Sequence, residues 1–237
     1  GKKYKQCHEK FDEKLAQLAR EGHIIPDRSL IKNKADIIGI KKSANINTGV
    51  LDHVTKNIHV GMSTGEIDRL VYDYTVSHGA IPAPLNYEGF PKSCCTSIND
   101  EVCHGIPDDN IILQEGDIVN VDVSTIFHGY YSDASRMFMI GEVSEEARRL
   151  VEVTKECLNI GIAAVKPWGH VGDIGAVIHK YATSKGYSVV VDFAGHGVGK
   201  EFHEDPVIGH VGRAGSGMVL APGMVFTIEP MINAGDY

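Results

Sequence analysis

Asp122 lies in the middle of an apolar run, IVNVDV at residues 118–123, that is typical of a buried strand. An unpaired carboxylate in such a strand is costly, so the fold must supply a partner for it. A second strand, predicted over residues 131–140, carries Asp133. If a hairpin closes through a two-residue loop at Phe127-His128, the two aspartates pair directly, with Cβ atoms about 4.5–5.5 Å apart on one face. A cation between them would offset the repulsion; the alternative is an aspartate that only accepts backbone hydrogen bonds in a turn.

Two further segments supply side chains of the same kind. His196 lies between glycines in GHGVG, and Glu229 ends the apolar run FTIE before a proline. Each has an ordinary interpretation, as a turn histidine and as a glutamate that points into water. Taken together with the aspartates, they form a mostly oxygen donor set, which suits divalent ions such as Mn, Fe, Co or Zn. The aspartate pair could bridge two ions, and paired ions activate water for hydrolysis.

Two other histidines occur in similar contexts. His104 lies in CHGIP and His203 lies in FHEDP, each with a proline three positions later. They are either loop histidines with local partners or cleft residues. In a cleft they could donate hydrogen bonds to a substrate amide and to the oxyanion formed from its carbonyl.

The pattern of the whole chain predicts an α+β fold. We expect helices from residue 11 to Gly22, from Asn33 to Gly61, from the capping box at Ser63 to Gly79, from Ser144 to about 165, and from Asp173 to Gly186. Residues 189–191 and 224–228 are expected to be buried strands. Because the strands pair in hairpins and do not alternate one for one with helices, α+β is favoured over a doubly wound sheet.

Composition limits the class of protein. The net charge of −8 argues against a chain that wraps nucleic acid over its whole surface, and no apolar run approaches the roughly 18 residues of a spanning helix. We expect no membrane segment and no secretory leader. The odd number of cysteines, five, predicts reduced thiols and a cytoplasmic location.

The motifs resemble those of type I methionine aminopeptidase. The resemblance rests on SIN and VCHGIP at 97–107, VD through SD at 121–133, GHGVG at 195–199, FHEDP at 202–206 and FTIEPM at 226–231. It covers nearly all of residues 30 to 237. It implies the pita-bread (creatinase/aminopeptidase) fold, whose pseudo-two-fold related halves place helices outside a curved, mainly antiparallel sheet. It also implies removal of the initiator methionine from nascent polypeptides.

The resemblance assigns a role to each candidate site residue. Asp122 would chelate one metal ion, Asp133 would bridge two, and His196 and Glu229 would hold the other. His203 would bind the scissile carbonyl, His104 would contact the amide of the second residue, and Glu229 would also shuttle a proton. A metal-bridging hydroxide would attack the first peptide bond. The residues that would line the methionine pocket are Tyr87, Phe90, Cys95, Phe202 and Met231, and their alternative is ordinary core packing.

Both ends depart from the family pattern. The family has a second bridging glutamate about thirty residues beyond the position of Glu229, on a final strand, and this sequence stops at Tyr237. Cys7 and His8 resemble the second half of an SEC-C-type zinc motif, which would hold a separate structural Zn in a longer N-terminus. The alternative is a basic tail. We therefore expect a basic arm at residues 1–10 and a catalytic domain at 11–237 that lacks its C-terminal strand.

Two other functions stay open. One is a proline-specific peptidase on the same fold, and the other is a non-catalytic pita-bread module that binds the ribosome or nucleic acid. The expected partners of the enzyme are nascent polypeptide N-termini and the ribosome, with no membrane, and the chain is expected to be a monomer.

Overall fold

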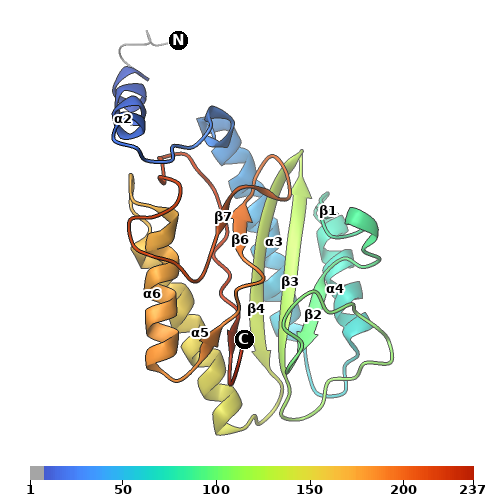
Figure 1. Cartoon of the computed structure of the whole chain (residues 1–237). Helices are drawn as coiled ribbons and strands as arrows, with labels where there is room; N and C mark the ends of the chain where they lie inside the picture. The colour runs from blue at the N-terminus through green and yellow to red at the C-terminus, as the bar shows by residue number, and fades with distance from the viewer. Residues whose placement is uncertain (1–7) are drawn as a thin grey trace.

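The computed structural model describes residues 8–237, so the predicted zinc ligand Cys7 lies outside the described residues. Figure 1 shows two groups of helices on either side of a central set of strands. The helices are α2 (Glu9–Arg20), α3 (Lys34–Asn57), α4 (Thr64–Ser77), α5 (Glu145–Ala164) and α6 (Val171–Ser184), with short 3-10 turns η1 (Arg28–Leu30) and η2 (Tyr87–Gly89). None of the helices in residues 8–237 is long and apolar enough to cross a membrane.

The strands form one larger sheet and two small ones. In the larger sheet β3 (Ile118–Phe127) pairs on one side with β4 (Tyr130–Met139) and on the other with β1 (Ile81–Pro82) and β2 (Cys95–Ile98), all antiparallel. The small sheets join β5 (Ser188–Val189) to β8 (Ile232–Asn233) and β6 (Gly195–Gly197) to β7 (Glu204–Ile208). This arrangement confirms the α+β prediction.

The core is divided into two clusters. One joins α3 and α4 to the larger sheet and includes Val119, Val121 and Val123, which are at most 1% exposed. The other joins α5 and α6 to the strands of the second half. Because side chains alternate along a strand, Asp122 and Ser124 lie on the face of β3 opposite the three valines. Burial of the valines therefore turns the aspartate away from the first core.

Local sequence signals set most helix starts. Asn33 caps α3, and Ser63 and Glu66 form a capping box on α4, as predicted; Asn33 and Asp36 also form a capping box, which was not predicted. Some helix boundaries differ. α2 begins at Glu9, two residues before the predicted start, and α3 ends at Asn57, before Gly61. The N-cap of α6 is His170, so Asp173 is at position N3 and is not the N-cap.

The predicted register of the β3–β4 hairpin is wrong by two residues. Asp122 pairs with Ser135, and Asp133 pairs with Ser124. The cause is the turn, in which His128 and Gly129 have φ of 50° and 80°. Two positive φ values define the type I′ turn that best suits a two-residue hairpin, and glycine adopts them readily. A shift of two residues keeps both aspartates on the same face, so they are diagonal neighbours.

The predicted strands of the second half are shorter than expected. Only Val189 of residues 189–191 is in a strand, and residues 224–228 contribute one isolated bridge, Gly197 with Phe226. Hydrogen bonds from Val198 N to the Val225 carbonyl (3.1 Å) and from Thr227 N to the His196 carbonyl (2.8 Å) still hold this segment beside β6. The segment therefore carries Glu229 to the same place without forming a regular strand.

A buried ion pair joins the start of α3 to the second half of the chain. The Lys32 ammonium contacts the Glu204 carboxylate, and their side chains are 1% and 9% exposed. Breaking such a pair by neutralising one partner typically costs about 3–5 kcal/mol, because the other charge stays buried. We therefore expect Glu204→Gln to lower the free energy of unfolding at pH 7.

The stability lost in Glu204→Gln should depend on pH. Burial alone would raise the pKa of Glu204, but hydrogen bonds from Lys32 and from two backbone N–H groups outweigh it, so the pKa lies below 4.5. The carboxylate therefore stabilises the fold fully above pH 4.5, and this contribution is lost as pH falls through the folded-state pKa. Urea unfolding between pH 7 and pH 3 should show a steeper loss below pH 4.5 for the unchanged chain than for Glu204→Gln. Parallel curves would contradict this assignment.

Candidate metal centre

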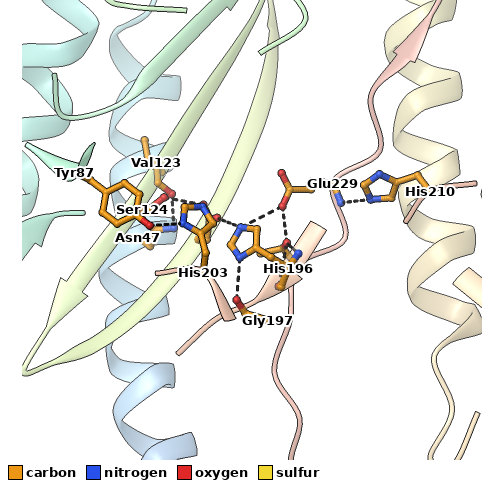
Figure 2. Close-up of polar contacts among 11 residues, drawn as sticks. Asn47, Tyr87, Val123, Ser124, His196, Gly197, His203, His210 and Glu229 are labelled. Atoms are coloured by element: carbon orange, nitrogen blue, oxygen red, sulfur yellow. Dashed lines mark hydrogen bonds and ion pairs between the residues drawn. The ribbon is translucent and has the colours of Figure 1, made fainter. Parts of the chain in front are cut away.

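Three of the four predicted metal ligands converge between the two halves of the chain. Asp133 of β4, His196 of β6 and Glu229 each offer one ligand atom, and these atoms lie within 4.8 Å of one another. His196 Nε2 is 3.3 Å from Asp133 Oδ2 and 3.5 Å from Glu229 Oε1. Figure 2 shows the His196 ring turned toward Glu229. Two carboxylates and one imidazole thus face a common point.

The orientation of His196 suits a metal ligand. Its Nδ1 lies 2.9 Å from the Gly197 carbonyl oxygen, which can only accept, so Nδ1 carries a proton and Nε2 faces the carboxylates, where it would be the atom that binds a metal ion. An outer hydrogen bond of this kind is the usual way in which proteins fix a metal-binding histidine. The flanking glycines are required by close packing, because a Cβ at Gly197 would overlap the Asp205 carbonyl oxygen and one at Gly195 would come within 2.6 Å of the Thr227 carbonyl oxygen.

The electrostatics of the centre favour a cation. Burial raises the pKa of Asp122 well above its usual value, and the negative charges of Asp133 and Glu229 raise it further. Burial would lower the pKa of His196, but hydrogen bonds to Asp133 and the Gly197 carbonyl outweigh this effect and raise it. The raised pKa values show that the carboxylates of this group carry more negative charge than their surroundings balance. A divalent ion would relieve this repulsion, so the residues present fit a metal ion of the hard or borderline class.

Asp122 lies at the edge of this group. Its backbone pairs with Cys95 on β2 and with Ser135 on β4, and its side chain shares a face with Asp133. The charge of Asp133 acts on its pKa, so the two carboxylates are close enough to interact. The three converging ligand atoms described above come from the other residues. Asp122 is therefore a neighbour of that group on the β3 side.

Two residues that the sequence did not single out hold Glu229 in place. Thr227 Oγ1 donates to Glu229 Oε1 at 2.5 Å, and the Glu229 backbone N–H donates to Nε2 of His210 at 3.1 Å. His210 is 2% exposed, and burial lowers its pKa to about 4, so its ring is neutral and can accept. Figure 2 shows this ring to the right of Glu229, on the side away from His196.

Replacing His210 by leucine is expected to weaken metal binding by about 10-fold or more, the usual cost of losing an outer-shell partner. The reason is that the Glu229 backbone would lose its acceptor. His210→Gln is the matched control, because its amide oxygen can reach the position of Nε2. Titration of the metal-free proteins with Mn²⁺ in a calorimeter measures both affinities. Equal affinities for His210→Leu and the unchanged chain would contradict this role.

His203 and Tyr87 lie beside His196. The Tyr87 hydroxyl is 3.0 Å from His203 Nδ1, and the rings of His196 and His203 are 4.4 Å apart. Burial lowers the pKa of His203, and the charge of His196 lowers it further. If Tyr87 donates to Nδ1, the proton of the neutral imidazole is on Nε2, where it can be donated to a carbonyl oxygen. Figure 2 shows this pair on the opposite side of His196 from His210.

His104 and the predicted pocket residues lie in several surrounding elements. His104 has a positive φ of 57° and packs edge-on against Phe193, with centroids 5.6 Å apart. Tyr87 and Phe202 form an edge contact of 4.9 Å, and Cys95 and Phe202 are both 9% exposed. Phe90 follows η2 and bonds Asn86 through its carbonyl, while Met231 bonds Val190 in the same way; both are half-buried. Cys95 therefore lies beside Asp122 of β3, and Tyr87 and Phe202 lie beside His203.

Comparison with known proteins gives a consistent result. The sequence model of metallopeptidase family M24 matches residues 39–236. Methionine aminopeptidase A of Synechocystis sp. is 50% identical over 211 residues, which are 89% of this chain and 83% of that protein. The crystal structure of methionine aminopeptidase from Rickettsia prowazekii matches with a TM-score of 0.86 and 47% identity, over 87% of this chain and 83% of that chain. X-Pro aminopeptidase from Thermotoga maritima matches with a TM-score of 0.70 and 25% identity, over 85% of this chain and 55% of that chain.

Proposed function

This chain belongs to metallopeptidase family M24 and is an aminopeptidase, and on that premise we propose that it releases the N-terminal initiator methionine from nascent polypeptides by hydrolysis of the first peptide bond. The observation that carries the proposal is the convergence of Asp133, His196 and Glu229 on one point. The 47–50% identity to methionine aminopeptidases, against 25% to the X-Pro aminopeptidase, favours methionine over proline specificity.

We propose that two divalent ions (Co, Mn, Fe or Zn) bind here, held by Asp122, Asp133, His196 and Glu229. The three carboxylates bring a charge of −3 against +4 from two divalent ions, so the charges nearly balance. When bound, such ions supply an activated water and polarise the scissile carbonyl. Burial and the negative charges of Asp133 and Glu229 raise the pKa of Asp122, and this supports the proposal because cations would offset the repulsion between the carboxylates.

In this proposal, side chains of the protein position the peptide substrate and transfer protons. The Nε2–H of His203 would donate to the carbonyl oxygen as it gains negative charge, and His104 would contact the amide of the second residue. Glu229 would pass a proton to the leaving amine, because its carboxylate is one of the groups that converge at the centre. The methionine side chain would occupy a pocket lined by Tyr87, Phe90, Cys95, Phe202 and Met231.

The proposal extends to the domain, the oligomeric state and the cellular location of the protein. We propose that residues 11–237 form one catalytic domain that acts as a monomer on nascent chains, near the ribosome and in the cytoplasm. The cysteines that the structure describes, Cys94, Cys95, Cys103 and Cys157, are free thiols, and free thiols are typical of a reducing compartment.

The experiment is release of free methionine from the peptide Met-Ala-Ser by the chain loaded with Mn²⁺, Fe²⁺ or Co²⁺. Methionine release supports the proposal. Cleavage confined to peptides that begin Xaa-Pro would replace it with the proline-specific alternative. Absence of both activities and of bound metal, together with salt-sensitive RNA binding, would replace it with the non-catalytic module.

A further inference from the structure

The loop that carries Phe202 and His203 is closed by a carboxylate at its end. Glu204 Oε1 accepts the backbone N–H groups of Lys200 at 2.7 Å and of Glu201 at 3.0 Å. Its other oxygen contacts the buried ammonium of Lys32, which lies 172 residues earlier in the sequence. One side chain therefore binds both the start of the loop and a distant segment.

A second ion pair ties the same loop to the same region. Lys200 Nζ lies 3.3 Å from Asp36 Oδ2, and the Asp36 side chain is 7% exposed. On the other side, the backbone N–H of Tyr131 in β4 donates to the Gly199 carbonyl at 2.8 Å. The loop is thus attached to the start of α3 by two opposite-sign pairs and to β4 by its backbone. We name residues Lys32, Asp36, Lys200 and Glu204 the loop clamp.

The clamp ends at the site. His203 immediately precedes Glu204 and lies between its contacts with Tyr87, Phe202 and His196. A shift of the Glu204 backbone would move the imidazole directly. Misplacement of a substrate-binding group by about 1 Å can cost on the order of 100-fold in rate. The loop clamp therefore controls the distance between the His203 imidazole and the substrate carbonyl, on which the rate of the proposed reaction depends.

Stability alone does not explain a buried ion pair. Desolvation of two charges consumes most of their attraction, and well-packed apolar residues often serve the fold equally well. The ion pair of Lys32 and Glu204 fixes the orientation of the Glu204 side chain, because the carboxylate must face the ammonium and the two loop N–H groups at once. Lys32 and Asp36 also precede residue 39, where the match to the family begins. A segment outside the matched region is therefore attached to the site.

We propose that Lys32, through its buried pair with Glu204, is a positioning residue for His203, so that the segment before α3 sets the rate of the reaction. This inference rests on the proposed function. Within residues 8–237 the Lys32 ammonium bonds Glu204 and forms no hydrogen bond with the converging ligands or with the proposed pocket residues, so it acts through the loop.

The test is a double-mutant cycle between Lys32→Met and His203→Ala. In the unchanged background, Lys32→Met should lower kcat for Met-Ala-Ser by about 10-fold or more, with KM and Mn²⁺ affinity within about twofold. In the His203→Ala background it should cause almost no further loss, because a residue that acts through His203 has nothing left to position. Lys41→Met, on the exposed surface of α3, is the matched control.

Two other results would overturn the proposal. One is an equal fold loss in both backgrounds, which indicates a general structural effect; the other is an unchanged kcat in Lys32→Met. Glu204→Gln breaks the same ion pair and replaces Lys32→Met if that variant does not fold. The expected losses in kcat, and the results that would overturn the proposal, are the same for both variants. NMR of the histidine rings in the metal-free chain gives a readout independent of activity. The His203 signal should move in Lys32→Met, and the His210 signal should not. If the unchanged chain releases no methionine, the proposed function is refuted, but this NMR measurement still tests the loop clamp.

Discussion

Replacing Asp133 by asparagine is expected to abolish methionine release and to reduce Mn²⁺ affinity by more than the roughly 10- to 100-fold that follows loss of an outer-shell partner. Asp133 supplies one of the three converging ligand atoms, and a neutral amide oxygen is a much weaker ligand for a divalent ion. The amide can still accept from Ser124 Oγ, which lies 2.8 Å from the carboxylate, so the local fold should persist.

The metal-free form of Asp133→Asn gives a second expectation. Burial raises the pKa values of Asp122 and Glu229, and the charge of Asp133 raises both further, so the carboxylates repel one another. Removing that charge relieves the repulsion but also weakens the pair with His196, so the stability of the metal-free chain should change little, while the stabilisation by added Mn²⁺ disappears. Calorimetry and thermal unfolding with and without Mn²⁺ measure both effects. Asp73→Ala on the exposed face of α4 is the control. Unchanged Mn²⁺ affinity in Asp133→Asn would contradict a metal centre that includes Asp133.

The sequence predicted the face on which the aspartates lie better than their register. The valines of β3 fix which side of the strand is buried, and that preference survives a shift of two residues. The register depends on the turn, which lies at His128-Gly129 and not at the predicted Phe127-His128. The local signal for this turn is the glycine, which adopts positive φ readily. His196 was predictable because its glycine neighbours left room for close packing, and Glu229 because it ends an apolar run.

The supporting residues could not be predicted in the same way. Lys32 lies in a segment without hydrophobic periodicity, and its partner Glu204 is 172 positions away. His210 is separated from Glu229 by 19 positions, and their contact depends on how β7 and the segment after residue 224 pack. Thr227 offered a weak signal, since a residue two positions before Glu229 in extended backbone lies on the same side. Contacts of this kind arise from tertiary packing, which a local pattern does not specify.

Replacing His203 by alanine is expected to lower kcat by about 100- to 1,000-fold, the usual cost of removing one hydrogen-bond donor to a developing oxyanion. Mn²⁺ affinity should stay nearly unchanged, because His203 packs beside His196 without replacing any of the three converging ligand atoms. Steady-state kinetics on Met-Ala-Ser and calorimetric titration of the metal-free variant separate the two effects.

Tyr87→Phe is the graded control for this assignment. It keeps the ring that packs on Phe202 but removes the hydroxyl 3.0 Å from His203 Nδ1, so Nε2 is no longer held as the donor. Its loss in kcat should be smaller than that of His203→Ala and should nearly vanish in the His203→Ala background, because the hydroxyl acts through the imidazole. A His203→Ala chain that loses metal affinity and kcat in equal proportion would instead make His203 part of the metal centre, and the division between ligands on one side of His196 and a carbonyl-binding histidine on the other would fail.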